Sequence, residues 1–101
     1  MLKFSILKQI KSTIFKTKSR YYFKQICERY IKELDNCELP NVPYQSNYHL
    51  KWMLVQILID EDQSLTKKHR WLGYVQGVLV ANFVINVDDE RNLTRNLFNG
   101  D

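Results

Sequence analysis

The stretch RWLGYVQGVLVAN, residues 70–82, decides the fold prediction. Its apolar residues recur at three- and four-residue steps, as they do on one face of an α-helix. Two glycines, Gly73 and Gly77, interrupt this helix, although each costs a helix interior about 1 kcal/mol relative to Ala. Because they are four residues apart, both lie on the same helix face. We expect a close neighbour there: another helix of this chain, a second subunit of a dimer, or a ligand.

The segments around this stretch also read as helices. We predict a helical hairpin at 47–82, with Asn47 and Thr66 as candidate N-caps, and a short helix after residue 87. The short helix begins with the acidic run DDE, which suits the positive end of the helix dipole. A connector at 36–46 contains two prolines, which exclude helix there. Short β-prone pieces have no strand to pair with, so the fold class is all-α.

The apolar faces of the hairpin indicate its core. Val75 and Leu79 are predicted core residues of the second hairpin helix. The first hairpin helix, YHLKWMLVQILI, is apolar around nearly its whole circumference, which predicts the most buried element of the molecule. Trp52 and Trp71 lie on apolar faces, and we expect both to serve mainly in packing.

Residues 1–35 are predicted to form a basic amphipathic arm, as one bent helix or as two helices. They hold nine Lys and Arg against three acids, and residues 36–101 hold six against eight. This asymmetry favours an acidic partner for the arm: nucleic acid, an anionic membrane or an acidic protein surface. The arm, the connector and the hairpin unit at 47–101 form one compact domain in this interpretation. The candidate partner-binding residues are Lys8, Lys11, Lys16, Lys18, Arg20, Lys67, Lys68, Arg70 and Trp71.

The chain carries no motif that indicates an enzyme. Its two histidines lack carboxylate or thiolate neighbours at metal-ligand spacing. The two cysteines match no zinc or CxxC spacing, and nothing marks either as an activated nucleophile. No glycine loop is present that could hold a phosphate group. We therefore expect no catalytic residue, no bound metal and no cofactor.

The sequence also bears on where the protein works. No stretch approaches the ~20 apolar residues of a membrane span, and the first residues lack the apolar core of a signal peptide. We expect a cytoplasmic protein without stable membrane insertion. A membrane-surface helix at 2–16 is the weaker alternative.

Three segments of the C-terminal half form a pattern: HLKWM at 49–53, KKHRWLGYVQGVLV at 67–80 and VDDERNLTR at 87–95. This pattern resembles small proteins of unknown role that are encoded by bacteriophages and prophages. The resemblance does not extend to 1–35, and proteins of this pattern commonly have Gly where Phe83 stands. The resemblance implies a non-enzymatic protein of the host-cell cytoplasm that inhibits a host defence complex by covering a binding surface, as anti-CRISPR proteins do.

Two kinds of partner remain open at this point. The first is a host protein or ribonucleoprotein complex, bound and occluded by this chain. The alternative is a nucleic acid, bound by the basic arm of an accessory protein, although no helix-turn-helix or RNA-binding motif is present. A homodimer is compatible with either function.

Overall fold

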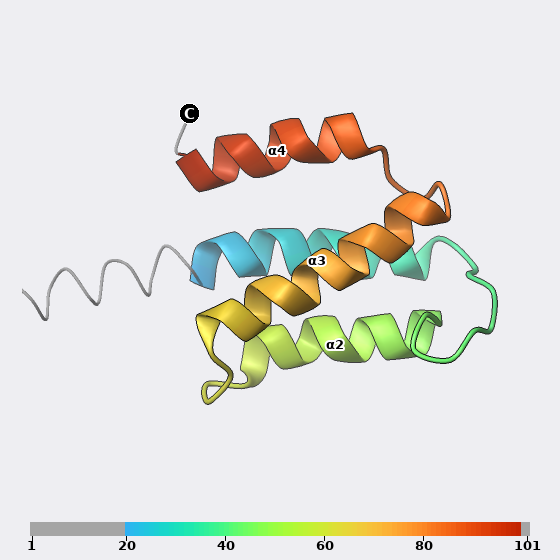
Figure 1. The fold of residues 1–101 in the computed structure, drawn as a ribbon, viewed down its shortest axis with the longest axis horizontal. Helices are drawn as coiled ribbons and strands as arrows, with labels where there is room; N and C mark the ends of the chain where they lie inside the picture. The colour runs from blue at the N-terminus through green and yellow to red at the C-terminus, as the bar shows by residue number, and fades with distance from the viewer. Residues whose placement is uncertain (1–19, 100–101) are drawn as a thin grey trace, which may run out of the picture.

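The computed structural model describes residues 20–99, apart from the side chains at 94 and 96–99. This part of the chain contains helices and no strand, so the all-α prediction is confirmed. Successive helices run in opposite directions (Figure 1). The helices are a first helix at 20–35, α2 (Asn47–Ile59), α3 (Leu65–Ala81) and α4 (Val87–Asn99).

The first helix belongs to the packed body of the molecule. Its side chains Phe23, Ile26, Tyr30 and Leu34 recur at three- and four-residue steps and are all buried. They belong to the same apolar cluster as the buried residues of α2 and α3. The described part of the predicted arm, 20–35, is therefore a core helix. The four arm lysines predicted to bind a partner lie outside the described residues: Lys8, Lys11, Lys16 and Lys18.

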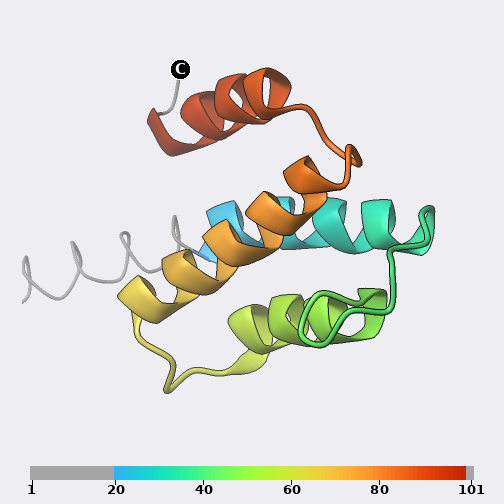
Figure 2. The ribbon, with the colours of Figure 1, turned by 45° about the vertical axis from the view of Figure 1, so that its right-hand side comes forward.

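Helices α2 and α3 are antiparallel neighbours joined by a short turn, as the hairpin prediction requires (Figure 2). The side chains of Leu50, Leu54, Val75 and Leu79 are fully buried in their shared core. This confirms the prediction for Val75 and Leu79. Burying a side chain of this size stabilises the folded state by about 1.5–3 kcal/mol.

The hairpin helices begin one or two residues before the predicted positions. Ser46 caps α2, because its Oγ accepts a hydrogen bond from the His49 amide at 3.3 Å. Ser64 caps α3 in the same way, through the Lys67 amide at 3.1 Å. The prediction that Thr66 is the N-cap of α3 is wrong, since Thr66 lies within the helix.

Asn47 is not an N-cap either; it is the first residue of α2, and its side chain holds the connector. Its Nδ2 donates hydrogen bonds to the carbonyls of Leu34 and Cys37 at 2.8 and 2.9 Å. Its Oδ1 accepts a hydrogen bond from the Leu39 amide at 2.9 Å. One amide group therefore joins the end of the first helix, the connector and the start of α2.

Helix α4 begins where the acidic run predicts. The Asn86 Oδ1 accepts hydrogen bonds from the amides of Asp88 and Asp89 at 2.9 and 3.2 Å. Asp88, Asp89 and Glu90 occupy the first turn, where the helix dipole favours negative charge. The short turn before it brings α4 to the first helix, where Glu90 contacts Arg29 and Tyr30.

Candidate protein-binding surface

Helix α2 has two opposite apolar faces and buries only one of them. The core face consists of Leu50, Met53, Leu54 and Ile57. The opposite face, which we call the outer stripe, consists of Tyr48, Trp52, Val55 and Ile59, with exposed fractions of 83%, 45%, 39% and 63%. The apolar circumference of α2 is not covered all round, because the other described helices pack on one side of it only. Large apolar side chains are thus left in contact with solvent.

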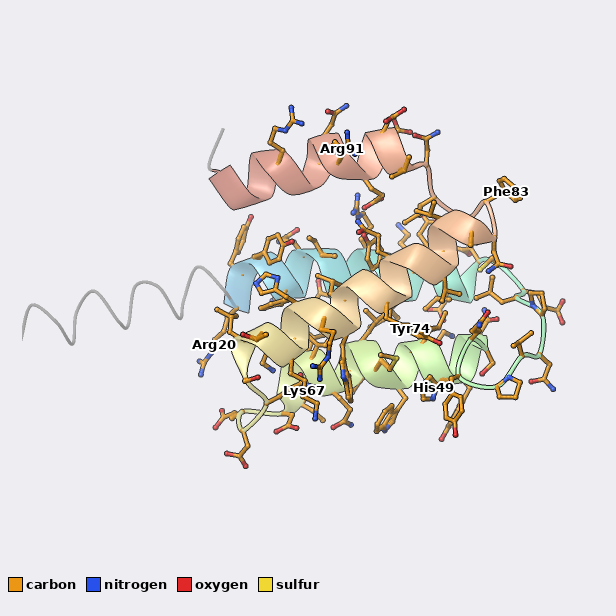
Figure 3. The ribbon with its side chains drawn as sticks, viewed as in Figure 1. Arg20, His49, Lys67, Tyr74, Phe83 and Arg91 are labelled. Atoms are coloured by element: carbon orange, nitrogen blue, oxygen red, sulfur yellow. The ribbon has the colours of Figure 1, made fainter. Side chains whose placement is uncertain are left out.

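A row of aromatic rings connects the outer stripe to α3. The ring centroids lie 5.3 Å apart for Tyr44 and His49, 5.7 Å for His49 and Trp52, and 5.7 Å for Trp52 and Trp71. The Lys67 ammonium lies 5.0 Å from the centre of the Trp71 ring, in cation–π geometry. Figure 3 shows Lys67 near the start of α3 and His49 near the start of α2. We call the outer stripe and the aromatic row together the α2–α3 surface.

The three cationic side chains predicted at the start of α3 have different surroundings in the structure. The Lys68 Nζ donates hydrogen bonds to the carbonyls of Ile57 and Asp60 at 2.6 and 2.8 Å. These carbonyls lie at the C-terminal end of α2, where a positive charge also suits the helix dipole. Lys68 therefore holds the hairpin together, and partner binding by this residue stays a prediction. Arg70 is exposed and Lys67 is half-buried beside the aromatic row, so both remain candidates.

The glycines of α3 do not pack against another described helix. Gly73 and Gly77 are both exposed. A Cβ atom added at either position would meet nothing within 4 Å. The expectation of a neighbouring helix of this chain is therefore wrong for residues 20–99. The missing Cβ atoms face solvent because the apolar face of α3, and not its glycine face, is turned toward the core.

The groups that could carry chemistry are buried or engaged in packing. Burial raises the pKa of the Cys27 thiol from 9.0 to about 12, which keeps it protonated and unreactive. The His69 ring lies 5.0 Å from the Phe23 ring and 5.9 Å from the Tyr22 ring. Among the described residues, no three His, Cys, Asp or Glu side chains are grouped as metal ligands. None of the helices in this part of the chain has the length and hydrophobicity needed to cross a bilayer.

Sequence reasoning missed a buried polar cluster that ties α4 to the rest of the molecule. Glu90 is only 5% exposed and forms an ion pair with Arg29 of the first helix. Its Oε2 accepts a hydrogen bond from the Tyr30 hydroxyl at 2.8 Å, and the Gln76 amide donates to the same hydroxyl at 3.0 Å. Burial and the bond to Glu90 raise the pKa of Tyr30 above its usual range. One feature of the sequence indicates this cluster. Tyr30 lies in the apolar stripe of the first helix, and a buried tyrosine needs a hydrogen-bond partner for its hydroxyl.

The charge of the described helices is balanced. Residues 20–99 contain ten Lys and Arg and ten Asp and Glu. The formal net charge of +4 therefore comes from the five lysines of residues 1–19, less the charge of Asp101. Arg20, another predicted partner-binding residue, is exposed at the first described position of the first helix (Figure 3). Strong electrostatic attraction for an anionic partner is thus not a property of the helical body.

Comparison with protein-family models, with curated proteins and with solved structures finds no match to this chain. Function is therefore inferred from the α2–α3 surface and the charges around it. That surface offers rings and aliphatic side chains that lose contact with water when a partner covers them. Such a surface is suited to binding.

Proposed function

We propose that this chain is a non-enzymatic binding protein whose α2–α3 surface docks a partner protein. The observation that carries the proposal is the outer stripe, in which Tyr48 and Ile59 expose 83% and 63% of their surface directly opposite the core face of α2. Exposed apolar patches on small proteins commonly mark interaction sites. Trp and Tyr, which both occur on this surface, are enriched among the residues that dominate binding energies.

The balanced charge of residues 20–99 favours a protein partner over a nucleic acid. Binding to a phosphate backbone gains its affinity from Lys and Arg that displace counterions. Next to the aromatic row, only Lys67 and Arg70 could act in this way, because Lys68 is used internally. An apolar and aromatic surface with two cations at one end is better suited to the apolar patch of a protein.

The resemblance to phage proteins suggests a setting for this binding. On that basis we propose that the partner belongs to a host defence complex. The chain would inhibit this complex by covering one of its binding surfaces, as anti-CRISPR proteins do. Occlusion needs no catalytic group, metal or cofactor. It needs a surface that binds tightly, and the α2–α3 surface is the candidate.

The test is recovery of a partner from nuclease-treated bacterial lysate with variants of matched chemistry. Tyr48→Ser removes an exposed ring from the outer stripe, whereas Tyr21→Ser removes one that is 59% exposed on the first helix. We expect nuclease and Tyr21→Ser to leave recovery unchanged, and Tyr48→Ser combined with Ile59→Ser to lower it at least tenfold. Recovery that is lost on nuclease treatment, with a steep dependence on salt, would instead support nucleic-acid binding through the basic arm.

A further inference from the structure

Helix α3 ends in a turn that places an aromatic residue in the left-handed region of backbone conformation. The Val84 amide donates to the Leu79 carbonyl at 2.9 Å, and the Phe83 amide donates to the Val80 carbonyl at 3.1 Å. These two bonds form the Schellman pattern of a helix C-terminus. Phe83 occupies the left-handed position of the pattern, with a φ of 61°. Glycine usually stands there, because a Cβ atom strains this conformation.

The Phe83 side chain is also almost completely exposed, at 95% of its surface. Figure 3 shows it pointing away from the helices where α3 turns toward α4. A phenyl ring in water gains nothing from the hydrophobic effect. Phe83 therefore combines backbone strain with exposure of an apolar ring, and packing within residues 20–99 compensates for neither.

Tyr44 provides an informative contrast, because it is also left-handed, with a φ of 64°. Its carbonyl accepts a hydrogen bond from the Tyr74 hydroxyl at 2.6 Å, so its conformation fastens the connector to α3. Its ring also contacts the ring of His49 in the aromatic row. The strain at Tyr44 thus serves the fold, whereas the ring of Phe83 is left to solvent. Strained residues of this kind are found at binding sites, where the strain holds a group ready.

We infer that Phe83 is an anchor residue: its ring enters an apolar pocket of the partner protein, and basic groups border that pocket. This inference rests on the proposed function. The basic border follows from the exposed carboxylates of Asp88 and Asp89 in the first turn of α4, and of Glu38 in the connector. The connector and the turn between α3 and α4 lie at the same end of the molecule (Figures 1 and 2). Opposite charges across an interface favour association, and a ring already held in solvent needs no rearrangement before it binds.

The first arm of the experiment measures the stability of the full chain. Phe83→Gly removes both the strain and the ring, so we expect a higher melting temperature than that of the wild type. Phe83→Tyr keeps both and should melt close to the wild type. A lower melting temperature for Phe83→Gly would show that the ring stabilises the fold, and this result would overturn the inference.

The second arm places a photo-crosslinking phenylalanine analogue, p-benzoyl-phenylalanine, at position 83 of the full chain in bacterial cells. Positions 48 and 93 carry the same probe: Tyr48 lies in the outer stripe, and Leu93 is an exposed control in α4. We expect one discrete protein adduct at 83, attached to an apolar segment that adjoins Lys or Arg. We also expect Phe83→Gly to reduce recovery of that protein at least tenfold and Phe83→Tyr to retain it.

The other outcomes test the anchor role of Phe83 separately from the proposed function of the α2–α3 surface. An adduct at 48 but not at 83 would overturn the role of Phe83 and leave the proposed function standing. Equal adducts at 83 and 93, or unchanged recovery with Phe83→Gly, would also overturn that role. Adducts at neither 48 nor 83 would contradict both. An adduct at 83 attached among acidic residues would refute the basic border of the pocket.

Discussion

Replacing either glycine of α3 by alanine is expected to stabilise the protein. Gly73 and Gly77 lie inside a helix of 17 residues, and an added Cβ meets nothing within 4 Å. No clash therefore opposes the gain in helix propensity, which favours Ala over Gly by about 0.8–1.0 kcal/mol in a helix interior. Part of the gain arises because Ala restricts the unfolded chain. We expect about 0.5–1 kcal/mol for each substitution and about 1–2 kcal/mol for the double variant.

Urea and thermal unfolding, followed by helical circular dichroism, measure this effect. In a domain of this size, 1 kcal/mol raises the melting temperature by about 4–8 °C. A loss of stability in Gly73→Ala or Gly77→Ala would refute the reasoning, since it would require a neighbour on the glycine face. A loss that grows with protein concentration would identify that neighbour as a second copy of the chain.

Three further predictions concern side chains that make contacts inside the molecule. Lys68→Met should destabilise the fold by about 1–3 kcal/mol in urea unfolding, because two carbonyls at the end of α2 lose their donor, while Lys67→Met should cost only about 0.5–1 kcal/mol. Glu90→Gln should lower the free energy of unfolding by about 1–3 kcal/mol. It should also speed amide hydrogen exchange in α4 without changing it in α2 and α3, and an equal increase of the exchange rate in all three helices would contradict this. Because the pKa of Cys27 is raised from 9.0 to about 12, its contribution to stability is complete below pH 9 and is lost as the pH rises toward 12. Unfolding measured across this range should show a shallower fall for Cys27→Ala than for the wild type, whereas equal slopes would refute the assignment.

The sequence predicted the helices because burial in an all-α protein follows three- and four-residue spacing. Phe23, Ile26 and Tyr30 in the first helix, and Val75 and Leu79 in α3, are buried as that spacing predicts. The N-caps were less predictable. Ser46 and Asn47 are adjacent and can both cap a helix, but the Asn47 side chain bonds to Leu34, Cys37 and Leu39, and Ser46 is the cap.

The outward faces could not be predicted for a different reason. An apolar circumference does not say which side of α2 is covered, so the outer stripe became visible only in the fold. Glycines at 73 and 77 are equally compatible with a helix face that packs against a neighbour and with a helix face that is exposed to solvent. Lys68 looks like its neighbour Lys67 in the sequence, and only the position of the end of α2 decides which amine turns inward.

The bonds of the Asn47 side chain also bear on the order in which the molecule assembles. They join groups only 8 to 13 residues apart, so the corner between the first helix and α2 closes a short loop at a small loss of chain entropy. The contacts of Glu90 with Tyr30 and Arg29 span 60 and 61 residues and form against a much larger loop. We therefore expect Asn47→Ala to slow refolding in stopped-flow measurements, and loss of the Glu90 carboxylate mainly to speed unfolding. Assembly would then follow the order of the chain, with α4 docking last.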